Sequence, residues 1–380
     1  MMRQLGRPNA RGTAPQPGGP VVVWNVTRRC NLDCLHCYSA SSDRQYGGEL
    51  TTAESLALLD DLKACRVPSL ILSGGEPLLR PDLLDLAGKA KSLGLHLGLS
   101  SNGTLLSPAL AEGVARAGFD YVGISLDGME ANHDRIRGRA GAFRQALTGL
   151  RACRDHGVKV GLRFTLTGQT VADLEPLLAL ATAEGVDRIY LSHLNFAGRA
   201  GANRQEAPDA AATRGVMERI FALAWADRIS GAAREFVSGN NDADGPFLLQ
   251  WLENHHPDLA RDARERLRRW GGNASGVGIA NIDNRGFVHP DIFWWHHPLG
   301  NVRETPFARI WWDEGARDPL LAGLRLRPRP LQGRCARCSH LDICGGNTRV
   351  RAWQTTGNPW ASDPGCYLTD GEIGLREEAA

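Results

Sequence analysis

The stretch from Cys30 to Tyr38 carries three cysteines, Cys30, Cys34 and Cys37, with the spacing C-x3-C-x2-C. Three thiolates on one loop form a soft, negatively charged ligand set that suits zinc, copper(I) or an iron–sulfur cluster. A cubane usually takes four thiolates, so three would leave one iron with an open position. A structural zinc site also wants four protein ligands, and the nearest histidine, His36, lies inside the cysteine loop. We therefore expect an iron–sulfur cluster here and give a zinc knuckle little weight.

A second group of four cysteines lies near the C-terminus, at Cys335, Cys338, Cys344 and Cys366. Four thiolates can saturate a cubane or hold a tetrahedral zinc ion, and their spacing alone leaves both open. The two remaining cysteines, Cys65 and Cys153, fall in helical patterns, and we interpret them as buried, inert thiols.

Length and composition indicate an ordinary globular protein. The chain has 380 residues, 42% hydrophobic and 23% charged, which suits one large domain and a smaller module. A net charge of +2 gives no strong signal for nucleic acid binding. The start of the chain lacks an apolar signal sequence, and no apolar stretch is long enough to span a membrane. Nine cysteines in such a chain predict metal ligands or free thiols in the reducing cytoplasm.

Apolar strand-like runs alternate with helical patterns from Val21 to about residue 200. The expected strands are Val21–Thr27, Ser69–Ser73, His96–Ser100, Tyr121–Leu126, Lys159–Leu166 and Arg188–Leu194. The expected helices between them are Thr52–Cys65, Pro81–Leu93, Pro108–Ala117, Ala142–His156 and Val171–Glu184. This alternation predicts an α/β fold with parallel strands and helical crossovers. About six such units fall short of the eight that close a TIM barrel.

Polar motifs follow successive strands, at the barrel end where active sites collect. Ser73-Gly74-Gly75-Glu76-Pro77 follows the second strand and Ser101-Asn102 ends the third. Ser125-x-Asp127-Gly128 follows the fourth, and His133-Asp134-x-x-Arg137 comes soon after it. Each motif alone is often only a turn. Their order along the chain is what indicates a shared site.

The cysteine spacing, the aromatic Tyr38 and the motifs G-G-E-P, S-x-D-G and H-D-x-x-R together resemble the radical SAM enzymes. The resemblance implies a partial (β/α)6 TIM-type barrel. It also implies a [4Fe–4S] cluster on Cys30, Cys34 and Cys37, with S-adenosylmethionine (SAM) chelating the fourth iron. Reduction of the cluster would then cleave SAM to a 5′-deoxyadenosyl radical.

The same resemblance implies a set of SAM-binding residues. The loop with Glu76 would bind the amino group of SAM, and Arg137 or Arg163 would pair with its carboxylate. Leu191 or Tyr38 would pack against the adenine. The full expected set is Tyr38, Gly74, Gly75, Glu76, Pro77, Ser101, Asn102, Ser125, Asp127, Arg137, Arg163 and Leu191.

From Ser275 onward the sequence pattern changes from α/β alternation to a predicted hairpin and a cysteine-rich segment. Val277–Ile282 and Phe287–Phe293, joined by the turn Asp283–Gly286, predict a β-hairpin. The C-x2-C-x5-C run after it resembles the SPASM/twitch modules of radical SAM enzymes. That implies a second [4Fe–4S] cluster, held by all four C-terminal cysteines, which would relay electrons or shape the substrate pocket. The hairpin itself supplies no cysteine, so we expect one auxiliary cluster rather than the two of a full SPASM module.

The predicted organisation has four parts. Residues 1–20 form a flexible lead-in, residues 21–235 the radical SAM partial barrel, residues 236–274 a linking helical segment, and residues 275–380 the small hairpin and cysteine-rich module.

The C-terminal third resembles one subgroup, the radical SAM proteins of haem d1 biosynthesis, through Asp291–Glu304, Leu341–Ala352 and Asp363–Asp370. The resemblance implies that propionate side chains are removed from didecarboxysirohaem, an iron-containing tetrapyrrole. An electron donor such as flavodoxin or ferredoxin would be needed. The adjacent tryptophans and histidines of Asp291–Glu304 could hold the macrocycle, or they could be a tryptophan-lined core with surface histidines.

Three alternatives stay open. A related haem-pathway radical SAM decarboxylase would share nearly all of these features. A SPASM peptide maturase would usually carry a leader-peptide domain before the barrel, and the roughly twenty lead-in residues are too few to bury a core. A zinc-stabilised binding protein on a barrel scaffold would have no catalytic activity.

Overall fold

The computed structural model describes residues 18–375 and is built on one ten-stranded sheet, ordered β10-β9-β8-β1-β2-β3-β4-β5-β6-β7. From β8 to β7 all neighbouring strands are parallel, while β9 and β10 pair antiparallel. The predicted lead-in lies outside the described residues except for 18–20. The strands are β1 Val21–Asn25, β2 Ser69–Ser73, β3 His96–Ser101, β4 Tyr121–Ser125, β5 Val160–Leu166, β6 Arg188–His193, β7 Glu235–Gly239, β8 Ile279–Ile282, β9 Phe287–His289 and β10 Gly300–Asn301.

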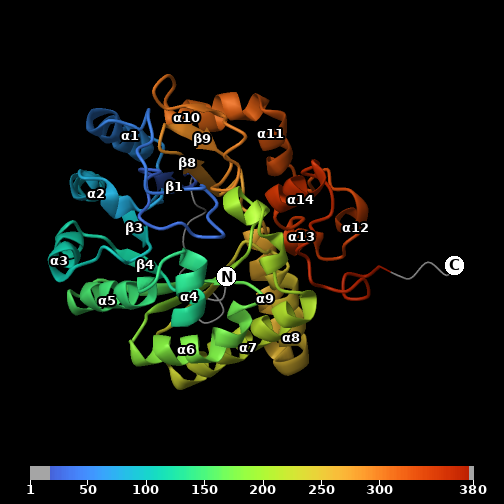
Figure 1. The fold of residues 1–380 in the computed structure, drawn as a ribbon. Helices are drawn as coiled ribbons and strands as arrows, with labels where there is room; N and C mark the ends of the chain where they lie inside the picture. The colour runs from blue at the N-terminus through green and yellow to red at the C-terminus, as the bar shows by residue number, and fades with distance from the viewer. Residues whose placement is uncertain (1–17, 376–380) are drawn as a thin grey trace.

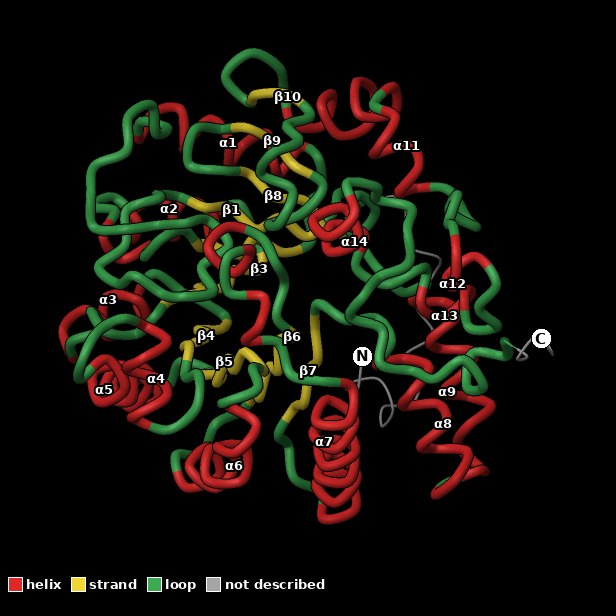
Figure 2. Tube along the Cα trace, turned by 45° about the vertical axis from the view of Figure 1, so that its right-hand side comes forward, coloured by secondary structure: helices red, strands yellow, loops and turns green. Residues whose placement is uncertain are grey.

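Helices flank the outer side of the arc that the parallel strands form (Figure 2). In Figure 1, the C-terminal helices α12, α13 and α14 gather on one side of the molecule, near α8 and α9. The helices are α1 Thr52–Ala64, α2 Leu83–Ser92, α3 Pro108–Arg116, α4 Glu130–Arg137, α5 Ala142–Asp155, α6 Leu174–Ala183, α7 Ala210–Ser230, α8 Asp244–His255, α9 Pro257–Trp270, α10 Phe307–Arg309, α11 Pro319–Arg325, α12 Gly333–Ala336, α13 Leu341–Cys344 and α14 Arg349–Thr356.

Sequence explains these elements locally. Parallel strands covered by helices are buried on both faces, which is why β1 is a continuous apolar run with Val22 and Trp24 fully buried. Helix α1 starts at a capping box in which Thr51 and Glu54 bond each other's backbone N–H groups. Helix α3 starts with Ser107 as N-cap and Pro108 in its first turn.

The predicted partial α/β barrel is confirmed, and the structure adds two strands to its parallel part. Strand β7 was not predicted because Glu235–Gly239 has neither the apolar run of β2 nor the apolar–polar alternation of β3; it is held by its pairing with β6. Strand β8 pairs parallel with β1, so the predicted hairpin extends the barrel sheet. Its second strand stops at His289, short of the predicted end, because Pro290 has no N–H group to donate to the ladder.

Candidate active site

The three cysteines of the first loop line one cavity of about 160 Å³ at the carboxyl ends of the strands. Cys30 and Cys34 are buried and Cys37 is half-buried. The cavity brings together most of the residues predicted for SAM, from the cysteine loop, from strands β2 to β5 with the loops after them, and from the end of α4: Tyr38, Gly74, Gly75, Ser101, Asn102, Ser125, Arg137 and Arg163. Four predicted residues do not line it, namely Glu76, Pro77, Asp127 and Leu191.

Each cysteine sulfur has a polar neighbour. Asn102 Nδ2 lies 3.8 Å from Cys30 Sγ, and an Arg137 guanidinium nitrogen lies 3.5 Å from Cys34 Sγ. The backbone N–H of Ser41 donates to Cys37 Sγ at 3.4 Å. Donors of this kind stabilise negative charge on sulfur and tune the potential of an iron–sulfur cluster.

The donor set suits a metal core. Burial, with Glu76 and Cys34 nearby, raises the pKa of Cys30 to about 12, and burial also raises the pKa of Cys34. These thiols therefore keep their protons at neutral pH unless a bound metal cation displaces the protons. In residues 18–375, no group of three or more His, Cys, Asp or Glu side chains is arranged to hold a single metal ion.

Gly74 and Gly75 are required by a close backbone approach. A Cβ at Gly75 would lie 2.2 Å from the carbonyl oxygen of Arg29, and one at Gly74 would lie 2.5 Å from that of Thr27. The N–H of Gly75 donates to the Thr27 carbonyl at 2.8 Å. Only glycine fits here, so these two residues fix the second strand loop against the segment that leads into Cys30.

Glu76 is fully buried and ties two strand ends together. Its carboxylate accepts hydrogen bonds from Ser101 Oγ and the Asn102 N–H, both at 2.8 Å, and from the Leu78 N–H at 3.2 Å. Burial raises the pKa of Glu76 to about 7 despite these donors. Its side chain therefore positions Ser101 and Asn102, which do line the cavity.

Asp127 organises another part of the cavity lining from a fully buried position. It forms an ion pair with Arg137 at 2.5 Å, accepts from His36 Nε2 at 2.8 Å and accepts from the Thr165 N–H at 2.7 Å. Burial alone would raise the pKa of Asp127, but Arg137 and His36 outweigh it and hold this pKa well below its usual range. The buried anion thereby holds Arg137 beside Cys34, inside the cavity lining.

Two more of the predicted side chains, Tyr38 and Arg163, line the cavity. Tyr38 accepts a hydrogen bond from Asn25 at 2.7 Å and meets the ring of Phe293 edge-on, with centroids 5.8 Å apart. Arg163 contacts Ser100 Oγ and lies over the Tyr190 ring, 5.2 Å from its centroid. Leu191, by contrast, is buried in the hydrophobic core.

Sequence reasoning missed several lining residues: His36, His193, Asn195, Asn240, Ile292 and Phe293. Asn240 follows β7, a strand that the sequence pattern did not predict. Asn195 follows β6, where position after a strand end was the available signal. Within Asp291–Glu304, only Ile292 and Phe293 line this cavity. Trp294 is buried instead, and His296 stacks on Trp353 with ring centroids 3.7 Å apart.

The four C-terminal cysteines line a second, much smaller cavity of about 20 Å³. An Arg334 guanidinium nitrogen lies 3.2 Å from Cys366 Sγ, and the His340 N–H donates to Cys338 Sγ at 3.4 Å. Burial, followed by nearby Asp242 and the other cysteines, raises the pKa of Cys344 well above its usual value. Four thiols that share one apolar pocket suit a fully ligated metal centre.

Comparison with known proteins shows which family the chain belongs to. The model of the Radical SAM superfamily matches residues 24–181. A relative named Pre-heme d1 synthase, from Dinoroseobacter shibae, is 52% identical over 96% of this chain and 89% of its own. The chain belongs to the radical SAM superfamily.

Two further comparisons describe this radical SAM enzyme. A relative named Fe-coproporphyrin III synthase, from Methanosarcina barkeri, is 44% identical over 94% of this chain and 90% of its own. In fold, the chain is similar to SuiB of Streptococcus suis bound to S-adenosylmethionine, with a TM-score of 0.70. That match is 18% identical and covers 93% of this chain and 78% of SuiB. Between residues 18 and 375, no helix combines the length and apolarity needed to cross a bilayer.

Proposed function

We propose that this protein acts in haem d1 biosynthesis and removes propionate side chains from didecarboxysirohaem by radical SAM chemistry. The observation that carries the proposal is the single cavity lined by three loop cysteines and by the ends of successive strands. The relative named Pre-heme d1 synthase, matched over nearly the whole chain, supports the choice of substrate.

Cys30, Cys34 and Cys37 would hold a [4Fe–4S] cluster, and Cys335, Cys338, Cys344 and Cys366 would hold a second one. Once reduced by an external electron donor, the first cluster would give SAM the electron that yields a 5′-deoxyadenosyl radical, the species needed to abstract hydrogen from carbon. The remaining residues bind and orient. Arg137 and Arg163 carry guanidinium groups at the cavity wall and suit the carboxylate of SAM.

The strand ends supply neutral polar contacts for SAM. Ser101, Asn102 and Ser125 line the cavity, and the backbone at Gly74 and Gly75 lies open to it because no side chain intervenes. Glu76 and Asp127 act indirectly, because they do not line the cavity but hold in place residues that do. We keep Tyr38 as a proposed adenine contact, since its ring lines the cavity beside the cysteines.

Ile292 and Phe293 would face the tetrapyrrole. They come from the segment that follows the hairpin and form an apolar side of the same cavity. A flat macrocycle gains from stacking on an aromatic ring. The Trp–His cluster around Trp294 and Trp353 would then support this wall from behind, since it lies outside the cavity lining.

The test is an anaerobic assay with SAM, a strong reductant such as dithionite, and didecarboxysirohaem. The expected result is 5′-deoxyadenosine together with a tetrapyrrole that has lost mass from its propionate side chains. A flavodoxin or ferredoxin should replace the chemical reductant. Deoxyadenosine with an unaltered macrocycle would contradict the proposed substrate while leaving a radical enzyme.

The same preparation distinguishes three other functions. The relative named Fe-coproporphyrin III synthase favours a related haem-pathway decarboxylase as the second candidate, which a different product mass would reveal. A peptide maturase would leave the tetrapyrrole unchanged. A zinc-stabilised binding protein would carry zinc and no sulfide, whereas two cubanes give about eight irons and eight sulfides per chain.

A further inference from the structure

The main cavity contains a buried amide without any partner. Asn195 is 6% exposed, lines the cavity, and neither its Oδ1 nor its Nδ2 makes a hydrogen bond. Leaving a buried polar group unsatisfied is costly, so such a group normally has a ligand or water to bind. Asn195 follows Leu194, at the end of β6.

A second amide on the neighbouring strand end is held in an unusual backbone conformation. Asn240, after β7, has a φ of +66°, in the left-handed region that side chains other than glycine rarely adopt. Its Nδ2 donates to Ser192 Oγ at 2.6 Å, and it also lines the cavity. Asparagine adopts this region more readily than most residues, and contacts around its backbone fix it here.

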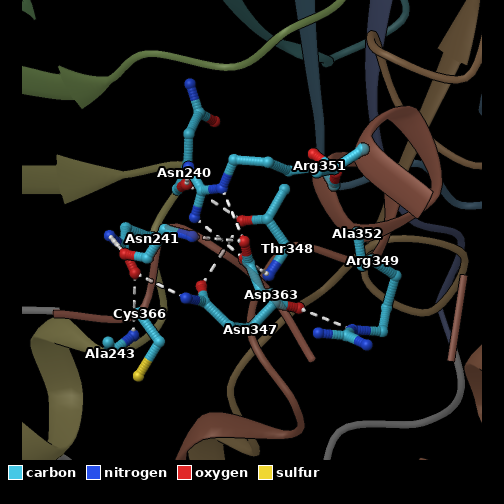
Figure 3. A network of polar contacts seen from close by, with 12 residues as sticks. Asn240, Asn241, Ala243, Asn347, Thr348, Arg349, Arg351, Ala352, Asp363 and Cys366 are labelled. Carbon is cyan, nitrogen blue, oxygen red and sulfur yellow. Dashed lines mark hydrogen bonds and ion pairs between the residues drawn. The ribbon is translucent and has the colours of Figure 1, made fainter. Parts of the chain in front are cut away.

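The contacts that enforce it come from the cysteine-rich region (Figure 3). The carbonyl of Asn240 accepts from Thr348 Oγ1 at 2.9 Å and from Arg351 at 3.2 Å. The same Arg351 nitrogen donates to the carbonyl of Leu194 at 3.2 Å. One guanidinium on α14 therefore holds the loops after both β6 and β7.

Arg351 is itself fixed by a buried partner beside a C-terminal cysteine. It pairs with Asp363 through two bonds of 2.7 and 2.9 Å, and both side chains are almost fully buried. The carbonyl of Asp363 accepts from the Cys366 N–H at 3.2 Å. A Cβ at Gly365 would lie 2.3 Å from the Arg351 guanidinium, so the turn before Cys366 packs directly against it.

We propose that Arg351 and Asp363 are positioning residues, which set the amides of Asn195 and Asn240 against the polar rim of the tetrapyrrole substrate. The amide N–H groups suit its carboxylates, and Oδ1 of Asn195 suits a bound water. This inference rests on the proposed function. The proposal gives the Cys366 region a role in shaping the substrate side of the cavity. This role does not depend on whether the metal centre proposed there transfers electrons.

The chain offers a matched control for Arg351. Arg349, on the same helix, is also fully buried, but it bonds only carbonyls of its own region, those of Gly346, Asn347, Pro359 and Ala361. Lysine keeps the charge but cannot hold a bidentate carboxylate and two carbonyls at once. R351K should therefore weaken tetrapyrrole binding about tenfold or more, while R349K should not.

Asn195 provides a variant that should not destabilise the protein. Because its amide bonds nothing in the protein, N195A should leave the thermal midpoint unchanged or raise it. It should nevertheless weaken tetrapyrrole binding several-fold. If Asn195 had only a structural role, N195A would lower the thermal midpoint instead.

The experiment titrates didecarboxysirohaem, followed by absorbance, and SAM, followed by the EPR signal of the reduced protein, into wild type, N195A, R351K and R349K. Weaker tetrapyrrole binding in N195A and R351K, with SAM affinity kept within twofold, supports the inference. Loss of SAM affinity alone, or tetrapyrrole binding unchanged in both variants, overturns it. A wild-type protein that binds no tetrapyrrole would instead overturn the proposed function.

Discussion

The two cysteine sites differ in how much space adjoins the sulfurs. The site of Cys30, Cys34 and Cys37 opens into about 160 Å³ lined by strand ends, whereas the four-cysteine site has about 20 Å³. Local charge does not separate them, because each has one arginine beside a sulfur, Arg137 and Arg334. The number of thiols and the adjoining space are the reasons for which we propose small-molecule chemistry at the first site.

The largest expected effect comes from removing a sulfur of the open site. C34A should abolish cleavage of SAM and lose about half of the iron, because two remaining thiolates cannot hold the first cubane. Iron analysis and deoxyadenosine release measure both. C153A is the control, since that thiol is buried in α5 outside both cavities, and it should keep the full iron content. Equal iron loss in both variants would contradict this assignment.

A backbone change should damage the open site almost as strongly. G75A places a methyl group 2.2 Å from the Arg29 carbonyl, so the loop into Cys30 must shift. We expect SAM affinity to fall at least tenfold, by calorimetric titration of the reconstituted protein. Gly88 is the matched control: it is exposed on α2 with open space around its Cβ position, so G88A should stabilise the helix by about 0.5–1 kcal/mol. Normal SAM binding by G75A would break the argument for close approach.

Removing a sulfur of the closed site should have a smaller effect on SAM. C344A should lose the second cluster and about half of the iron, while the first cluster still binds SAM and cleaves it with dithionite as reductant. Turnover of the tetrapyrrole should fall more than SAM cleavage does, because Cys366 and its neighbours adjoin the cavity loops through Asp363 and Arg351. Loss of both clusters in C344A would show that the two sites are not independent.

The smallest effect is expected at the apolar wall of the open cavity. F293A removes a ring that lines the cavity and contacts Tyr38, so KM for didecarboxysirohaem should rise several-fold with little change in kcat. W270A serves as the control, because Trp270 is exposed at the end of α9. An equal change in KM for didecarboxysirohaem in both variants would show that Phe293 does not contact the substrate.

Most of the open site was predictable, because its residues lie in or after strands that apolar side chains mark, in a run as in β2 or in alternation as in β3. Ser101 and Ser125 are the last residues of β3 and β4, and Cys30 lies in the loop after β1, so local pattern placed them together. Asn240 could not be found in this way, because β7 has little apolar sequence and depends on pairing with β6. The sequence also did not show that Glu76 accepts hydrogen bonds from Ser101 and Asn102, or that Asp127 pairs with Arg137. The predicted contacts of Glu76 and Asp127 with SAM stay predictions.

The fold shows the same division between local and long-range information. The first six strands and the hairpin turn were evident, since each is coded within a few residues. The pairing of β8 with β1 joins Val21–Trp24 to Ile279–Ile282 across most of the chain, and no local pattern specifies such a partner. The link from Arg351 to the carbonyls of Leu194 and Asn240 is equally non-local.

EPR spectroscopy of the dithionite-reduced protein, with and without SAM, tests the central distinction between an open and a closed site most directly. We predict two cubane signals, of which only one shifts when SAM is added, and that signal should be the one missing from C34A. A spectrum in which SAM moves neither signal, or moves the signal that C344A removes, would contradict this account.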